Sequence, residues 1–193
     1  MDLAISNWIY NTFGTNSFFA NFWKIVTMLG SEFIIIGAVL VLLAFKKTRK
    51  LGFYMLIACG GAWVFNSMIL KPIIERPRPF VDHPDLAGIC NLAGLELPDE
   101  FSMPSGHSIV SMAVAMSVFM FSKKWGGIAF IYPFMIGLSR ICLCVHYFTD
   151  VLVGWVVGAG VAIAVYYVLN WLIKYYLTKK ENGNGKDSSS VSE

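Results

Sequence analysis

Residues Val151–Tyr175 read VLVGWVVGAGVAIAVYYVLNWLIKY, an apolar run whose single charged side chain is Lys174. A helix needs about 20 consecutive apolar residues to cross a bilayer, so this run is long enough to span one. The whole chain of 193 residues has a matching composition, with 56% hydrophobic and 14% charged residues. Soluble domains have about 45–50% and about 25%, so the composition indicates a membrane protein and excludes a disordered chain, a coiled coil and a collagen-like fibre.

Four more apolar stretches lie upstream of this run. The shortest is Glu32–Phe45, and we expect it to borrow residues from 25–30 or to tilt little. Together the five stretches predict an all-α integral membrane helical bundle of about five transmembrane helices, with its core at residues 32–175. The remaining three stretches are Leu51–Leu70, Ser105–Ser122 and Gly126–Val145.

Residues 1–30 form two short segments with apolar side chains at helical spacing. Polar side chains such as Asn11 and Lys24 lie on the other faces, so we expect short amphipathic helices that lie in the membrane interface. The apolar positions are Ile5, Trp8, Ile9 and Phe13 in the first segment and Phe18, Phe22, Val26 and Leu29 in the second.

Basic residues indicate the orientation, because short loops rich in Lys and Arg stay in the cytoplasm. Ten of the 15 basic residues follow the first, third or fifth span, on one side of a five-span bundle. We therefore expect a multi-pass protein of the cytoplasmic membrane with its N-terminus outside and its C-terminus inside. The loops 71–104 and 147–150 then face out. The ten residues are Lys46, Lys47, Arg49, Lys50, Lys123, Lys124, Lys174, Lys179, Lys180 and Lys186.

Two features of the C-terminal part complete the domain prediction. Residues 178–193 turn polar and contain Asn-Gly-Asn-Gly and a Ser triplet, which predicts a disordered cytoplasmic tail behind a single domain at residues 1–177. In the last span, Gly154 and Gly158 form a G-x-x-x-G pattern that lets another helix approach closely. We expect that helix to come from the same chain, with a dimer interface as the alternative. The oligomeric state is left open.

Five basic residues fall on the outer side, and four of them, all except Lys24, lie at or near predicted outer helix ends, against the positive-inside tendency. Arg140 is the sharpest case, because it interrupts an apolar run where a charge costs a few kcal/mol on insertion scales. Such a residue usually marks a pathway, a partner or a bound anion. The alternative is that Arg140 reaches lipid headgroups or pairs with Asp150. The other three are Lys71, Arg76 and Arg78.

The segment Pro104-Ser105-Gly106-His107 stands where the outer loop becomes the third span. Pro and Ser begin helices well, and Gly leaves the backbone amides uncovered. Free N–H groups at the positive end of a helix, together with the Ser105 hydroxyl, predict an anion site. His107 lies in the first turn of the same helix and points toward the same place.

His146 and Asp150 are spaced i and i+4, which lets the carboxylate bind one imidazole nitrogen. The other nitrogen is then a directed nucleophile or base, and the carboxylate stabilises the imidazolium. A metal pair is the alternative. Against it, the surroundings are cationic and no further carboxylate or cysteine cluster lies nearby, whereas hard metals need oxygen ligands. The positive groups and helix amides together predict a pocket for a multiply charged anion, with phosphate as the best candidate.

The four cysteines show no metal-type spacing and lie mostly in apolar stretches, as packing residues of a membrane protein do. A disulfide from Cys90 to Cys142 or Cys144 is left open, and the fourth cysteine is Cys59.

Three motifs, in this order, resemble those of the type 2 phosphatidic acid phosphatase (PAP2) superfamily, which includes the vanadium haloperoxidases. Lys71 to Arg78-Pro79 is similar to K-x6-R-P, residues 104–107 match P-S-G-H, and Ser139-Arg140 through His146 to Asp150 is similar to S-R-x5-H-x3-D. The resemblance covers residues 32–175. Many relatives have six spans, and the helix predicted at residues 2–13 replaces the first of them here.

The resemblance implies a role for each matching residue. His146 would attack phosphorus and form a phosphohistidine, Asp150 would orient it, and His107 would protonate the leaving oxygen and then activate water. No cofactor and no metal are implied, because a basic cluster stabilises the charge. Arg76 also precedes a proline, but the spacing favours Arg78 and leaves Arg76 to contact a headgroup or a residue behind the site. The expected phosphate ligands are Lys71, Arg78, Ser105, Gly106 and Arg140.

The implied function is hydrolysis of a phosphomonoester or pyrophosphate on a lipid at the outer face of the membrane. Undecaprenyl pyrophosphate is the first candidate. Phosphatidylglycerol phosphate, phosphatidic acid and lipid A phosphates stay open, as does the choice between monophosphate and pyrophosphate. The expected partners are the lipid substrate and membrane lipids, without nucleic acid. A non-catalytic lipid-phosphate binder or transporter and a haloperoxidase are the competing functions, although the two histidines favour chemistry and the hydropathy disfavours a soluble haloperoxidase.

Overall fold

The computed structural model describes residues 1–189, with side chains through Lys180. Every regular element in this part of the chain is helical. In chain order the elements are α1 Asp2–Phe13, α2 Ser17–Met28, α3 Glu32–Ala44, α4 Arg49–Phe65, the π-helical turn η1 Asn66–Leu70, α5 Lys71–Ile74, α6 Pro79–Asp82, the 3-10 turn η2 Pro84–Leu86, α7 Ala87–Leu92, α8 Gly106–Phe121, α9 Lys123–Ala129, α10 Ile131–Cys142 and α11 Phe148–Ser189.

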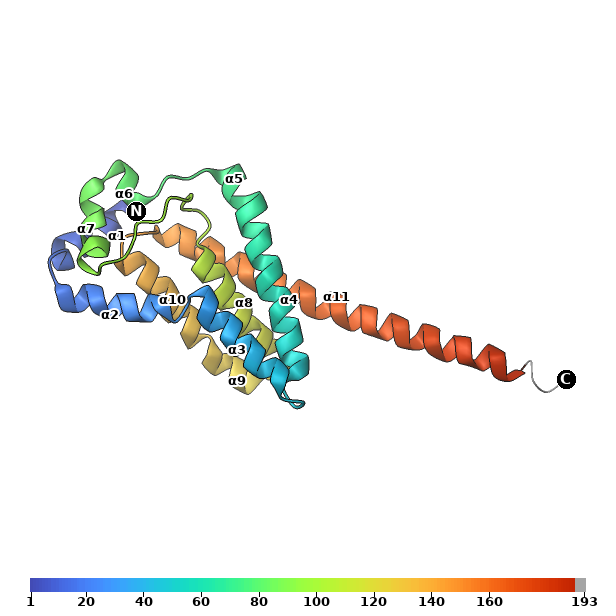
Figure 1. Ribbon diagram of the computed structural model, residues 1–193. Coiled ribbons are helices and arrows are strands. Elements are labelled where there is room, and N and C mark those ends of the chain that lie inside the picture. The colour runs from blue at the N-terminus through green and yellow to red at the C-terminus, as the bar shows by residue number, and fades with distance from the viewer. Residues whose placement is uncertain (190–193) are drawn as a thin grey trace.

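Five helical segments form the bundle, which confirms the predicted fold class. Four of them are long and apolar enough to cross a membrane: Ser17–Ala44, Arg49–Asp82, Lys123–Cys142 and Phe148–Lys180. The fifth is α8, a shorter apolar helix. It packs against α4, α10 and α11 and so forms the centre of the bundle (Figure 1).

The first crossing combines α3 with the helix before it. α2 and α3 meet at a bend in the chain between Met28 and Glu32 (Figure 1). α2 is amphipathic as the sequence predicts: Ala20 and Val26 are buried, whereas Phe18 is exposed. It packs along α10. α2 therefore supplies the length that α3 lacks, and its buried face is attached to the bundle.

Gly154 and Gly158 bring α11 into direct contact with α8. A Cβ added to Gly154 would lie 2.9 Å from the Cβ of Ser108, and one added to Gly158 would lie 2.1 Å from the carbonyl oxygen of Ile109. The two helix backbones therefore touch where these glycines lie, which confirms the prediction of close packing within one chain. Because α8 carries His107 and α11 carries Asp150, this contact fixes the distance between two parts of the predicted site.

The C-terminal end of α11 extends past the rest of the bundle (Figure 1). The sequence predicts an irregular tail from Thr178, whereas α11 continues as a helix to Ser189. Its aromatic side chains beyond the bundle, such as Trp171 and Tyr176, are exposed. Residues 190–193 of the predicted tail lie outside the described residues.

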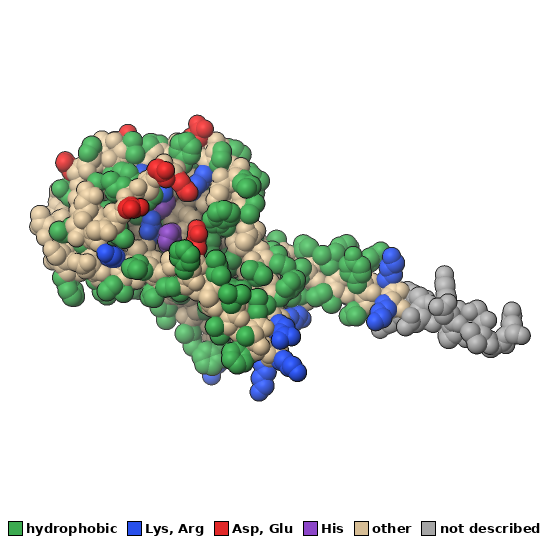
Figure 2. All heavy atoms as spheres, in the orientation of Figure 1, with side chains coloured by type: hydrophobic (Ala, Val, Ile, Leu, Met, Phe, Trp, Pro, Cys, Tyr) green, Lys and Arg blue, Asp and Glu red, His purple; other side chains and the backbone are tan. Residues whose placement is uncertain are grey.

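Charged side chains separate along the bundle (Figure 2). Lys and Arg gather at one end, where the α3–α4 and α8–α9 connections lie, and most Asp and Glu gather at the opposite end around a hollow that contains histidine. The four cysteines in the described residues are free, so the disulfide left open by the sequence does not form.

We expect Gly158→Ala to destabilise the bundle, because the new methyl group would overlap the carbonyl oxygen of Ile109. Moving α8 away from α11 costs on the order of 1–3 kcal/mol, as overpacking of a close contact does. Gly160→Ala is the matched control, since a Cβ at that position meets nothing within 4 Å. Thermal unfolding in detergent measures both variants. Equal melting temperatures for the two would contradict the contact.

Candidate active site

The three motif segments meet at one cavity, which opens at the acidic end of the bundle (Figure 2). The cavity has a volume of about 260 Å³. Ser105 and Asp150 do not line it, because both are fully buried behind its wall. The other six residues predicted for the site all line the cavity: Lys71, Arg78, Gly106, His107, Arg140 and His146.

His146 lies in the short connection between α10 and α11. Its hydrogen bonds determine which ring nitrogen carries the proton. Arg78 Nη1 lies 3.2 Å from His146 Nε2. A guanidinium only donates, so Nε2 accepts and the proton of the neutral imidazole is on Nδ1. Nδ1 in turn lies 3.5 Å from Asp150 Oδ2. In this tautomer Nε2 carries the lone pair that a nucleophile requires, and that lone pair accepts the hydrogen bond from Arg78 at the cavity wall.

Burial sets the protonation state of His146. It lowers the pKa of the imidazole to about 3, the hydrogen bond to Asp150 raises this pKa in part, and the charges of Arg78 and Arg140 lower it. The ring is therefore neutral throughout the physiological pH range. Its Nε2 needs no deprotonation before it reacts.

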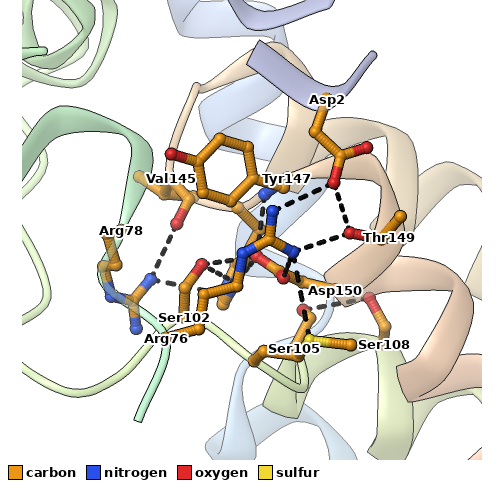
Figure 3. Close-up of polar contacts among 12 residues, drawn as sticks. Asp2, Arg76, Arg78, Ser102, Ser105, Ser108, Val145, Tyr147, Thr149 and Asp150 are labelled. Carbon is orange, nitrogen blue, oxygen red and sulfur yellow. Dashed lines mark hydrogen bonds and ion pairs between the residues drawn. The ribbon is translucent and has the colours of Figure 1, made fainter. Parts of the chain in front are cut away.

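Asp150 is held by three donors besides His146. The backbone N–H of Tyr147 donates to Oδ2 at 2.8 Å, the hydroxyl of Ser102 donates to the same oxygen, and Arg76 Nη1 donates to Oδ1 at 2.6 Å (Figure 3). The carboxylate is completely buried. A buried charge needs such partners, because an unpaired one is costly. The side chain therefore has one fixed orientation toward His146.

Arg78 and Arg140 are buried cations at the cavity. Arg78 donates from Nε to the carbonyl of Glu100 at 2.6 Å and from Nη1 to the carbonyl of Val145 at 2.9 Å. Arg140 donates from Nη1 to Thr27 Oγ1 of α2 at 2.8 Å, while its Nε has no partner. The alternatives for Arg140 are thus corrected: it neither reaches headgroups nor pairs with Asp150, because α2 covers it. Two buried guanidinium groups give the cavity a strongly positive wall.

Lys71 also lines the cavity but has an acidic partner. Its side chain is 9% exposed, and its ammonium pairs with the carboxylate of Glu100, whose side chain is 63% exposed. Glu100 belongs to the loop between α7 and α8, which also carries Glu96 and Asp99. Its carboxylate therefore lies where a phosphoryl oxygen would meet Lys71.

Ser105 does not line the cavity, and its contacts hold two helices together. Its backbone N–H donates to the carbonyl of Asp150 at 3.1 Å, and its hydroxyl accepts from Ser108 at 3.0 Å. It thereby ties the beginning of α8 to α11. The uncovered N–H groups that an anion would use are those of the first turn, at Gly106 and His107.

Two further polar residues belong to the site and were missed by the sequence reasoning. Asn66 is buried, lines the cavity, and has an unpartnered Oδ1. It lies five residues before Lys71, and the π-helical turn η1, closed by the Lys71 N–H to Asn66 carbonyl bond, puts both on one face. The sequence signal that could have indicated Asn66 is its position as a polar residue inside a predicted span. Ser102 is fully buried between His146 and Asp150, and no motif indicates it.

The sequence profile of the PAP2 superfamily matches residues 47–174. The chain belongs to the PAP2 superfamily. The matched residues include every motif residue from Lys71 to Asp150, and they exclude α1, α2 and α3. The N-terminal helices and the end of α11 thus lie outside the family profile.

Curated PAP2 relatives differ in the lipid that their names specify. The chain is 30% identical over 136 residues to an undecaprenyl-diphosphatase of Sulfolobus acidocaldarius, covering 69% of this chain and 62% of that relative. It is 32% identical over 145 residues to a decaprenylphosphoryl-5-phosphoribose phosphatase of Mycobacterium tuberculosis, covering 74% and 69%. The chain therefore spans somewhat less than two thirds of the archaeal relative.

A solved structure shares the fold. It is a transmembrane PAP2-type phosphatidylglycerolphosphate phosphatase from Bacillus subtilis, with a TM-score of 0.68 and 27% identity. The match covers 88% of this chain and 84% of that one. The similarity reaches beyond residues 47–174 and so includes part of the N-terminal region.

We expect acid to destabilise this protein partly through His146. In the unfolded chain the imidazole has a pKa near 6.5, whereas the folded value is about 3. The unfolded state therefore binds the extra proton first, and stability present above pH ~6.5 is lost as the pH falls toward 3. The melting temperature in detergent between pH 7.5 and 4.5 measures this loss. His146→Gln, which cannot titrate, will show a smaller decrease; an equal decrease would contradict a neutral, buried His146.

Proposed function

We propose that this PAP2 protein is a metal-independent lipid phosphatase that acts through a phosphohistidine intermediate. The cavity contains the two groups that the reaction needs, a nucleophilic Nε2 on His146 and a second imidazole on His107. Cations and helix amides surround them and are positioned to stabilise the charge on the phosphoryl oxygens. The arrangement of residues 1–177 around this one cavity supports a single domain.

The chemistry follows from the positions of the two histidines. Nε2 of His146 attacks phosphorus, the bond from phosphorus to the leaving oxygen breaks, and His107 donates a proton to that oxygen. Asp150 stabilises the positive imidazole of the phosphohistidine through the Nδ1–H. His107 then takes a proton from water, the water oxygen attacks phosphorus, and the electron pair of the P–N bond returns to Nε2. Inorganic phosphate leaves and both histidines return to their starting states.

A lipid substrate is supported by an apolar groove that joins the cavity. The groove runs between α3 and α4 and has a volume of about 370 Å³. A soluble phosphate ester would have no use for such a groove, whereas a hydrocarbon chain would bury its surface there. Four residues line both the groove and the cavity: Glu32, Ile35, Trp63 and Val110. The continuity of the groove with the catalytic cavity is the observation on which the lipid assignment rests.

Undecaprenyl pyrophosphate is the proposed substrate, because a curated relative is named as an undecaprenyl-diphosphatase. Relatives named for a decaprenyl phosphate ester and for phosphatidylglycerol phosphate make these classes, phosphatidic acid and lipid A phosphates the alternatives. The basic loops at the opposite end of the bundle support an outward-facing site in the cytoplasmic membrane, with the N-terminus outside and the C-terminus inside.

Phosphate release in detergent tests the function. The four substrates are undecaprenyl pyrophosphate, phosphatidylglycerol phosphate, phosphatidic acid and a lipid A phosphate, each with EDTA present. We expect release from at least one lipid by the wild type and a loss on the order of 10³-fold or more in His146→Ala, since the covalent nucleophile is removed. Release that stops with EDTA and returns with a divalent ion would support a metal mechanism. No release by folded protein would favour a binder or transporter.

We expect Gly60→Leu to weaken binding of long-chain substrates only. Gly60 lines the groove and a Cβ there meets nothing within 4 Å, so the helix accepts a side chain that then occupies the groove. KM for the best lipid phosphate should rise several-fold, while hydrolysis of a water-soluble aryl phosphate stays unchanged. Gly61→Leu is the matched control, because Gly61 is equally open but lies outside the groove lining. Equal KM values in the two variants would contradict chain binding here.

A further inference from the structure

Arg76 lies behind Asp150, on the side away from the cavity. Its Nη1 donates to Asp150 Oδ1 and to Thr149 Oγ1, each at 2.6 Å, and its Nη2 donates to Asp2 Oδ2 at 3.0 Å (Figure 3). The guanidinium carbon lies 4.0 Å from the ring centroid of Tyr147, which stacks on it. Arg76 does not line the cavity. The headgroup contact considered for Arg76 in the sequence is therefore not supported by its position.

Arg76 fixes the position of both oxygens of the Asp150 carboxylate, one directly and the other through Ser102. It binds Oδ1 directly through its side chain. Its backbone carbonyl accepts the N–H of Ser102 at 2.8 Å, and the Ser102 hydroxyl donates to Oδ2. One residue thus fixes the carboxylate from two sides and leaves Oδ2 directed at Nδ1 of His146.

Asp2 at the beginning of α1 completes the arrangement. Its Oδ2 accepts from Arg76 and from the hydroxyl of Thr149. The guanidinium therefore lies between two carboxylates, Asp2 and Asp150, and the three groups together carry one negative charge. That charge faces an imidazole that becomes positive in the phosphohistidine. Without Asp2, Arg76 and Asp150 would neutralise each other and the imidazolium would lose part of its stabilisation.

We propose that Arg76 is a positioning residue for Asp150 and that Asp2 tunes this pair, so that α1 is part of the catalytic unit although the family profile does not include it. This inference rests on the proposed phosphatase function. A shallow depression over Arg76 is lined by Asp2, Tyr147 and Thr149 and shares no lining residue with the cavity. An anion bound there would not reach His146, which favours the positioning role over substrate binding.

Steady-state kinetics of the full-length protein in detergent distinguish positioning of Asp150 from substrate binding by Arg76. We expect Arg76→Gln to lower kcat about 10–100-fold, as loss of a group that orients a reacting residue does, with KM within about twofold of wild type. Arg76→Lys should recover part of kcat, since an ammonium reaches one carboxylate but does not bridge two. Asp2→Asn should lower kcat several-fold alone and add nothing in the Arg76→Gln background. Arg49→Gln, at an exposed arginine near the basic end, is the matched control.

Binding of inorganic phosphate, the reaction product, and thermal unfolding give two independent readouts. The affinity for phosphate should not change in Arg76→Gln, because Arg76 does not line the cavity. A higher KM or weaker phosphate binding with normal kcat would overturn the proposal in favour of substrate binding. A wild-type kcat in Arg76→Gln would also overturn it. So would losses of kcat that, across all variants, are proportional to the decrease in melting temperature. Inactive wild type on every lipid phosphate would instead overturn the proposed function, and with it the role of Arg76.

Discussion

The carboxylate of Asp150 is the point at which distant parts of the chain meet. It receives hydrogen bonds from Arg76 after α5, Ser102 before α8 and the backbone of Tyr147, and it faces His146. A buried anion in a membrane bundle requires all its donors to be in place, so these contacts are satisfied together or not at all. The contact of α8 with α11 at Gly158 then holds the helix that carries His107 against the helix that carries Asp150. The site and the fold therefore depend on the same few contacts.

The apolar spans and the charged motif residues were predictable from the sequence, because both signals are local. Apolar length determines which helices cross the bilayer, and cations that violate the positive-inside tendency stand out without a structure. The i and i+4 spacing of His146 and Asp150 also predicts their contact correctly, at 3.5 Å. Six of eight predicted site residues line the cavity for this reason.

The contacts behind the cavity were not predictable, because they join residues far apart in the sequence. Asp2 reaches Arg76 across 74 positions, and Ser102 reaches Asp150 across 48. Neither residue stands in a pattern that distinguishes it from an ordinary surface or loop residue. Ser105 matches the motif, yet its hydroxyl bonds to Ser108, because helix packing rather than motif membership decides where a side chain points. The path of α11 beyond residue 177 likewise depends on more than composition.

The ion pair between Lys71 and Glu100 places a carboxylate of the chain itself at the cavity, where an anion would bind. Glu100 is tethered by the chain, so it competes with any incoming anion as an internal ligand whose effective concentration is on the order of millimolar. A lipid phosphate that gains contacts in the apolar groove can displace this carboxylate, whereas free inorganic phosphate lacks those contacts. Glu100 would thus lower the affinity for product and substrate by the same factor, and inorganic phosphate, which lacks the groove contacts, would remain the weaker ligand. The loop between α7 and α8 therefore supplies a carboxylate that can replace a departing phosphate on Lys71.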